Sequence, residues 1–144
     1  MSQKPVTQVA GFDVVLEAAP GPEDDVARVA YTAAAVELLR ELWRRHGPLM
    51  FHQSGGCCDG SAPMCFPAGE FRTGGADVLM GTAELSDDDG SVLGPLELWI
   101  SREQFNAWKH TALVIDAVKG RGSGFSLEAP TGQRFLTRSQ LCAT

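Results

Sequence analysis

The sequence predicts an α+β domain dominated by mixed or antiparallel β-sheet. Strand-like and helix-like segments follow one another in the order strand, helix, several strands, helix, several strands, which is not the alternation of a doubly wound nucleotide fold. A chain of 144 residues has the length of one domain. Its composition, with 44% hydrophobic and 21% charged residues, is that of a globular protein.

The first 22 residues are expected to form an N-terminal extension with room for one strand. A short apolar piece that starts at Val14 is followed by an Ala-Pro-Gly-Pro stop at 19–22, which is typical of a turn. Residues 23–144 are expected to form the single domain.

The domain begins with an alternating strand over 26–31 and a helix over 33–46. Thr32 is a suitable N-cap, and Gly47 followed by Pro48 ends the helix. The helix has an apolar stripe at helical spacing that consists of Ala35, Leu38, Leu39, Leu42 and Trp43.

Short apolar or alternating runs predict the remaining strands. They lie at 49–53, 77–84, 95–100, 112–118, 124–128 and 133–137. Acidic residues at 87–90 mark a hairpin or loop, and a capping box at 101–104 predicts a second short helix over 102–110.

Composition and charge exclude several classes of protein. A net charge of −6 argues against non-specific binding of nucleic acid, which needs Lys and Arg to neutralise phosphates. No apolar run approaches the ~20 residues of a membrane-spanning helix, so no membrane association is expected. The first residues lack the pattern of a signal peptide, and a reducing cytoplasm is the expected location.

Three of the four cysteines lie within nine residues, in a glycine-rich loop that follows the strand 49–53. Thiols with a nearby histidine suit iron, zinc, copper(I) or an iron–sulfur cluster, and the glycines let the backbone curl around a ligand. We expect Cys57, Cys58 and Cys65 to be the thiolate ligands, with His52 and Cys142 as further candidates. Adjacent side chains diverge, so Cys57 and Cys58 do not readily chelate one ion together.

Two other interpretations of the loop stay open. The cysteines can be small buried residues of a turn, since free cysteine is often buried. Alternatively, a loop thiolate acts as a nucleophile with His52 as its base, although no other motif of an enzyme accompanies it. Binding is therefore favoured over catalysis.

The run HGPLMFHQSGGCCDGSAPMC, at 46–65, resembles an uncharacterised bacterial family that is associated with aldehyde dehydrogenases of alcohol catabolism. The resemblance covers residues from about 28 to 142. It implies an aldehyde dehydrogenase as a partner and supplies no mechanism.

The chain is also similar, more distantly, to A-type iron–sulfur carriers of the HesB type. Their loop with the first cluster cysteine resembles residues 54–60, and their Gly-Phe-containing segment resembles residues 124–130. The resemblance implies a HesB-like fold. Those carriers end in a C-x-C pair, whereas this chain has Cys142 alone and Cys65 in addition, so another kind of metal, or one held between subunits of a homo-oligomer, is also consistent with the sequence.

The sequence thus predicts a cytoplasmic HesB-like domain that binds a metal ion or an iron–sulfur cluster through its cysteine loop. Its expected role is that of an accessory protein for an aldehyde dehydrogenase. A thiol-dependent redox or aldehyde-handling enzyme, and a non-catalytic module that docks on a dehydrogenase, are the alternatives.

Overall fold

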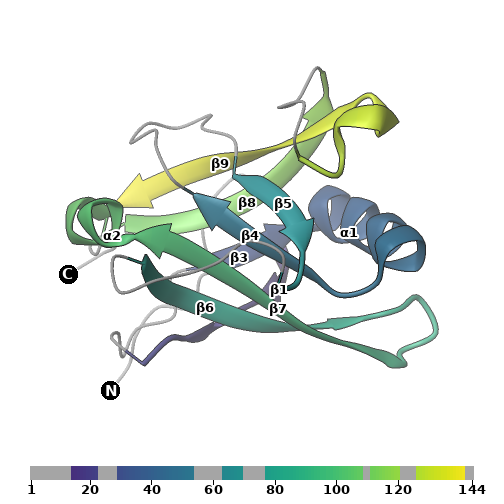
Figure 1. Ribbon diagram of the computed structural model, residues 1–144, viewed down its shortest axis with the longest axis horizontal. Coiled ribbons are helices and arrows are strands. Elements are labelled where there is room, and N and C mark those ends of the chain that lie inside the picture. The colour runs from purple at the N-terminus through teal and green to yellow at the C-terminus, as the bar shows by residue number, and fades with distance from the viewer. Residues whose placement is uncertain are drawn as a thin grey trace.

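The computed structural model describes residues 14–22, 29–53, 63–69, 77–108, 111–120 and 126–141. In this part of the chain, two β-sheets face each other across a shared hydrophobic core, and helix α1 (Ala33–His46) lies at one end of both (Figure 1). The predicted α+β class is confirmed.

The four-stranded sheet has the order β1-β3-β8-β9. Its strands are β1 (Val14–Glu17), β3 (Val29–Thr32), β8 (Thr111–Lys119) and β9 (Gln133–Leu141). The central strands β3 and β8 are parallel, whereas the two outer pairs are antiparallel. The sheet is therefore mixed, as predicted.

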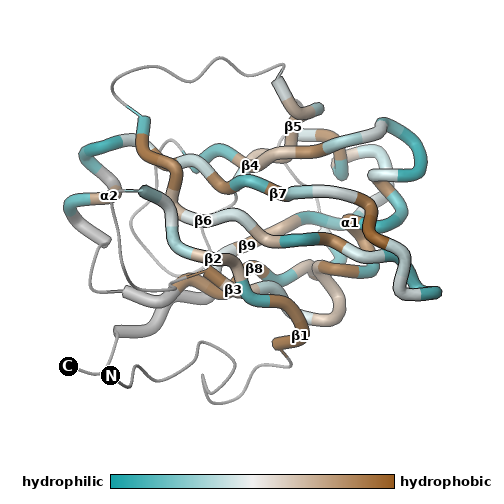
Figure 2. Tube along the Cα trace, turned by 90° about the horizontal axis from the view of Figure 1, so that it is seen from below, coloured by the Kyte–Doolittle hydropathy of each residue, from teal (hydrophilic) through white to brown (hydrophobic). Residues whose placement is uncertain are grey.

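The five-stranded sheet has the order β2-β6-β7-β4-β5. Its strands are β2 (Ala19–Pro20), β6 (Asp77–Ser86), β7 (Val92–Ser101), β4 (Leu49–Gln53) and β5 (Met64–Pro67). Strands β4 and β7 are parallel and the other pairs are antiparallel. Figure 2 shows the hydrophilic tip of the hairpin between β6 and β7 beyond the more apolar strands.

The ends of β4 and β7 and the start of β6 lie together at one end of this sheet. Because β4 and β7 are parallel and β6 is antiparallel to β7, the last residues of β4 and β7 lie beside the first residue of β6. We call this the loop end of the sheet and define it by Gln53, Ser101 and Asp77. The cysteine-containing residues 54–62 follow β4 from here.

Helix α1 forms as its sequence predicts. The Thr32 hydroxyl accepts a hydrogen bond from the backbone N–H of Ala35 at 3.2 Å, and Gly47 takes a positive φ of 81° where the helix ends. Its apolar stripe is buried against both sheets. The second helix, α2 (Arg102–Trp108), follows β7, and residues 109 and 110 of the predicted helix lie outside the described residues.

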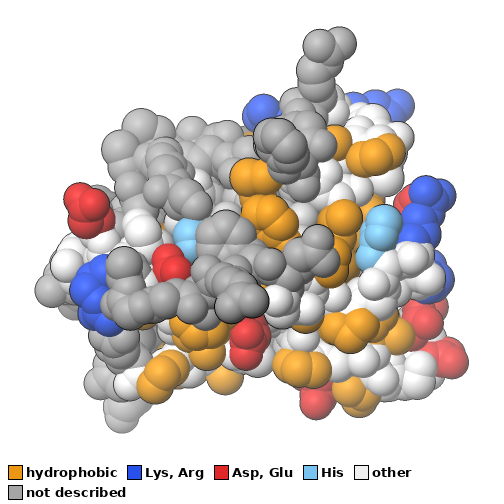
Figure 3. Space-filling model, viewed as in Figure 1, with side chains coloured by type: hydrophobic (Ala, Val, Ile, Leu, Met, Phe, Trp, Pro, Cys, Tyr) orange, Lys and Arg blue, Asp and Glu red, His pale blue; other side chains and the backbone are white. Residues whose placement is uncertain are grey.

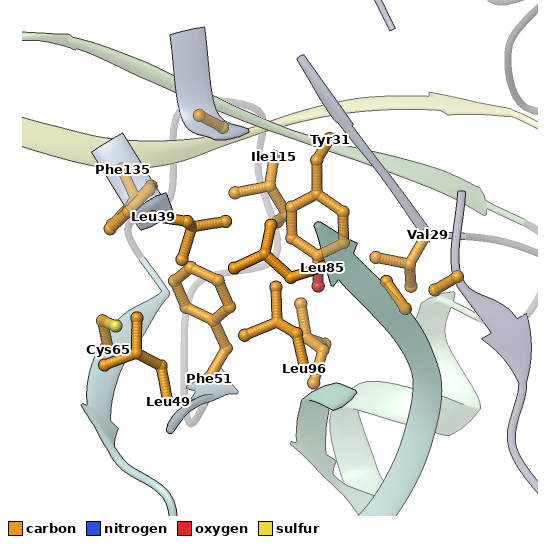
Figure 4. Packing of buried hydrophobic residues seen from close by; sticks show 14 of the residues in the cluster. Val29, Tyr31, Leu39, Leu49, Phe51, Cys65, Leu85, Leu96, Ile115 and Phe135 are labelled. Atoms are coloured by element: carbon orange, nitrogen blue, oxygen red, sulfur yellow. The ribbon is translucent and has the colours of Figure 1, made fainter. Parts of the chain in front are cut away.

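The core lies between the sheets, and aromatic rings form its centre (Figure 4). Phe51 of β4 stacks on Tyr31 of β3, with ring centroids 6.1 Å apart, and meets Phe135 of β9 edge to face at 4.9 Å. These three residues come from distant parts of the sequence, so their contacts hold the two sheets together.

The structure differs from prediction at residues 126–128. They form a bend and a turn, so the predicted strand at 124–128 is wrong for these residues. The Ser126 hydroxyl accepts a hydrogen bond from the backbone N–H of Cys65 at 2.8 Å, and the backbone N–H of Leu127 donates to the Cys65 carbonyl at 3.0 Å. These contacts hold the segment against β5 instead of in a strand of its own.

Strand β5 and the two-residue strand β2 were not expected. Strand β5 lies at the end of the segment that the sequence predicts as a loop. It forms because it pairs with β4, and the local sequence gives no sign of this pairing. Within the predicted N-terminal extension, β1 joins the four-stranded sheet and β2 joins the five-stranded sheet. Ala18, between them, is 2% exposed and belongs to the core.

Candidate metal centre

His52 lies on β4, one residue before the loop end of the five-stranded sheet. It is paired with Trp99 of β7 on one side and with Met64 of β5 on the other. Its side chain is 4% exposed. Since side chains alternate along a strand, His52 faces away from the core into which its neighbour Phe51 points.

Asp77 pairs with His52. The His52 Nε2 atom lies 2.9 Å from the Asp77 Oδ1 atom, and the Asp77 side chain is 16% exposed. Asp77 is the first residue of β6, which is separated from β4 by β7, so the two side chains converge across the strand between them. The structure thus places a nitrogen donor and an oxygen donor together where the cysteine loop leaves the sheet.

Sequence analysis did not single out Asp77. It is an aspartate at the start of a predicted strand, 25 residues after His52, and no local motif joins them. The only signal in the sequence is that a charged residue opens a strand whose next three residues are apolar.

Cys65 lies on the other face of the sheet from His52. It is paired with Phe51 on β4, is 0% exposed and belongs to the hydrophobic core. Burial, and then the charge of Glu128, raises the pKa of the Cys65 thiol far above its ordinary value. The sulfur therefore stays protonated, and the structure does not bring it together with His52.

The remaining predicted ligands, Cys57, Cys58 and Cys142, lie outside the described residues. Within the ranges that the structure describes, no group of three or more His, Cys, Asp and Glu side chains is placed to hold a metal ion. Of the five predicted ligands, the structure thus describes two, and it separates them.

A second buried polar cluster surrounds the backbone of Cys65. The Ser126 hydroxyl, which accepts from the Cys65 N–H, donates a hydrogen bond to the carboxylate of Glu128. Glu128 is 1% exposed. Burial raises the pKa of this carboxyl, and hydrogen bonds from Ser126 and from the backbone N–H groups of Glu128 and Phe135 oppose the rise in part. The cluster fixes β5 against the turn at 126–128.

The outer face of the five-stranded sheet is partly apolar. In Figure 3, hydrophobic side chains gather on the side of the molecule where β4, β5 and β7 lie. Trp99, half-buried on this face, donates a hydrogen bond from its indole nitrogen to Glu97 at 3.0 Å. His52 therefore has two apolar register partners, Trp99 and Met64, on the neighbouring strands.

Fold and site together define an α+β protein with two facing sheets and a histidine–aspartate pair at the end of the strand that precedes the cysteine-containing segment. The chain belongs to the DUF779 family, a domain of unknown function, whose family profile matches residues 38–141. This range includes His52, Cys57, Cys58, Cys65 and Asp77 and stops one residue before Cys142.

Other comparisons identified no relative. No curated protein and no solved structure matches the chain. The similarity to HesB-type carriers and the link to aldehyde dehydrogenases stay predictions. In the described part of the chain, neither helix has both the length and the apolar character needed to cross a bilayer.

Proposed function

We propose that this protein binds a transition-metal ion at the loop end of its five-stranded sheet and serves as an accessory protein. The observation that carries the proposal is the 2.9 Å approach of His52 Nε2 to Asp77 Oδ1 at the end of the strand that precedes the cysteine-containing residues 54–62. Imidazole and thiolate ligands suit zinc and iron, and a carboxylate commonly accompanies a metal-bound histidine.

Chain connectivity supports the participation of loop thiols. Cys57 is five residues after His52, and Cys58 is six residues from both His52 and Met64, which are paired across β4 and β5. Five residues span at most about 18 Å, so the chain is long enough for the thiols to reach the pair. We assign the ligand role to His52 and to one of Cys57 and Cys58, because adjacent cysteine side chains diverge and Cys65 would have to leave the core to join them.

Metal analysis of anaerobically purified protein tests this function. We expect about one equivalent of zinc or iron in the wild type and its loss in the Cys57→Ser/Cys58→Ser double variant and in His52→Ala. His46→Ala is the matched control, because His46 is exposed at the end of α1. Stoichiometric metal that survives the cysteine and His52 substitutions would refute the proposal.

The same pair also suits a thiol-dependent enzyme. A carboxylate that orients a histidine can prepare it to act as a base toward a loop thiol. This second candidate predicts rapid alkylation of Cys57 or Cys58 near pH 6, slowed in His52→Ala. Slow alkylation of both thiols in metal-free protein would eliminate it.

The role beside an aldehyde dehydrogenase is supported by the resemblance of residues 46–65 to a family that is associated with such enzymes. If the protein delivers or holds metal for such an enzyme, the two are expected to co-purify. If it only docks on the enzyme, co-purification survives replacement of Cys57 and Cys58. Failure of the two proteins to associate, with or without metal, would remove the accessory role.

A further inference from the structure

We infer that this protein forms a homodimer in which strand β9 pairs with β9 of a second copy across a two-fold axis. The dimer goes beyond the proposed function and does not depend on metal binding. Four strands, β1, β9, β2 and β5, lie at the edges of the two sheets. An edge strand carries backbone N–H and C=O groups on its outer side, and proteins either block such an edge or use it to bind another strand.

Three of the four edge strands have a feature that blocks pairing. Strand β2 has two residues, and one of them, Pro20, lacks a backbone N–H. Strand β1 has four residues, and its register with β3 shifts between Val14 and Leu16. Strand β5 is covered by the turn at 126–128, which forms hydrogen bonds with both the backbone N–H and the carbonyl of Cys65.

Strand β9 has none of these features. Its nine residues include no proline and pair with β8 in an unbroken register, from Gln133 opposite Lys119 to Leu141 opposite Thr111. Among the described strands, none follows β9 in the four-stranded sheet, and Figure 1 shows β9 in yellow on the upper side of the molecule. Of the four edges, β9 is therefore the one best suited to bind another strand.

A second copy of β9 matches this edge. A two-fold axis relates two identical strands in antiparallel orientation, which is the orientation that β9 already has relative to β8. When the nine residues overlap fully, Gln133 lies opposite Leu141 of the partner subunit. Odd-numbered positions are then opposite odd-numbered positions, so the face to which the core residue Phe135 belongs continues across the axis.

The two arginines of β9 favour full overlap. Arg134 and Arg138 are the charged residues of this strand. In full overlap they lie opposite positions 140 and 136 of the partner subunit, which hold uncharged residues. A shift of two residues would place Arg134 opposite Arg138 of the partner subunit, and like charges directly opposite each other are destabilising.

Pairing through β9 also limits the assembly to two chains. The dimer joins two four-stranded sheets into one continuous sheet that has β1 at both ends. Because β1 is short and shifted in register, and β2 and β5 are blocked, the described strands leave no further long regular edge.

The molar mass of the full chain in solution is the first test. By light scattering coupled to size-exclusion chromatography, we expect twice the 15.4 kDa of one chain, with a decrease toward 15.4 kDa on dilution. A monomer at every concentration from micromolar to millimolar would overturn the inference.

Hydrogen exchange of the wild-type protein at low and at high concentration locates the interface without a substitution. We expect the backbone amides of β9 to exchange at least about tenfold more slowly in the dimer. Strand β1, the other edge of the same sheet, is the internal control and should not change. A dimer in which β9 exchanges as fast as in the monomer contradicts pairing through this edge.

Two matched proline variants give a third measurement, because proline removes a backbone N–H. Successive N–H groups of a strand point to opposite edges, so Arg138→Pro is replaced by Ser139→Pro if it does not fold. We expect the folded β9 variant to dimerise at least about tenfold more weakly than the wild type. Val15→Pro, at the register shift of the exposed strand β1, should dimerise like the wild type. A folded β9 variant with unchanged dimerisation would overturn the inference.

Discussion

Tyr31 places a hydroxyl group in the centre of an apolar core. The residue is 0% exposed, and no described group forms a hydrogen bond with its hydroxyl. Burial, and to a smaller extent the neighbouring Cys65, raises the pKa of this phenol, so it stays neutral. An unsatisfied buried hydroxyl destabilises the folded state.

Removing that hydroxyl is expected to stabilise the protein. Tyr31→Phe keeps the ring and its stacking with Phe51 and should raise the free energy of unfolding by about 1 kcal/mol. Urea denaturation of both proteins measures the difference. A loss of stability would show that the hydroxyl has a partner in the folded protein.

Glu128 is the second residue whose burial has a thermodynamic consequence. Because its folded-state pKa is raised, mainly by burial, folding favours the protonated carboxyl. The contribution of this group to stability is therefore greatest below the unfolded-state pKa, about 4.3, and is lost as the pH rises through the higher folded-state value.

Glu128→Gln removes the titrating carboxyl, so comparison with the wild type shows whether Glu128 stabilises or destabilises the fold as the pH falls. Relative to the variant, the wild type is expected to gain stability as the pH falls from 7 toward 4, because the folded wild type takes up a proton in that window. Denaturant unfolding at several pH values gives the difference in free energy directly. A difference that does not change with pH, or that favours the variant in acid, contradicts the expectation.

At the scale of elements, helix α1 is joined to the β6–β7 hairpin by two arginines. Arg40 donates from Nε to the Ser86 carbonyl and from Nη1 to Asp88, both at 2.8 Å, and Arg44 Nη2 contacts Asp87 at 2.7 Å. A backbone N–H and Arg44 hold the pKa of Asp87 below its ordinary value. The predicted acidic hairpin therefore has a structural partner on α1.

Arg40 should contribute more to stability than an exposed arginine of the same helix. Its side chain is 20% exposed, whereas Arg45, which pairs with Glu41 at 3.3 Å within α1, is 63% exposed. We expect Arg40→Ala to cost about 1 kcal/mol and Arg45→Ala less than about 0.5 kcal/mol. Equal effects in urea denaturation, in low and in high salt, would show that the hairpin contact is not stabilising.

For the molecule as a whole, the segment before β3 connects the two sheets. The Ala18 N–H donates to the Val29 carbonyl at 2.9 Å, between β1 on one sheet and β2 on the other. At Gly21, an added Cβ atom would lie 1.9 Å from the Leu79 carbonyl oxygen. The segment thus lies in close contact with both the core and β6.

Removal of this segment is expected to destabilise the entire fold. The free energy of unfolding of a chain that begins at residue 23 should be at least about 2 kcal/mol lower than that of a chain that begins at residue 14. The shorter chain loses β1, β2 and Ala18. Gly21→Ala in the full chain should also be destabilising, since the carbonyl of Leu79 would have to move. Equal stability of the two shortened chains would show that β1 and β2 are dispensable.

Local sequence predicted the elements whose stability is local. Helix α1 has its cap at Thr32, its stop at Gly47 and its apolar stripe within 16 residues, and all three appear in the structure. The turn at 126–128 and strand β5 could not be predicted in this way, because contacts between the two segments, 61 residues apart in the case of Cys65 and Ser126, hold each in place.

The sequence by itself determined the α+β class, most of the strands and helix α1, because periodicity and capping act over a few residues. It also singled out His52 as a candidate ligand just before the cysteine-containing segment. Only the tertiary structure decided that His52 meets Asp77 and that Cys65 faces the core. The physical reason is strand register: the pairing of β4 with β5 and β7, and of β7 with β6, sets which side chains share a face and which ends meet.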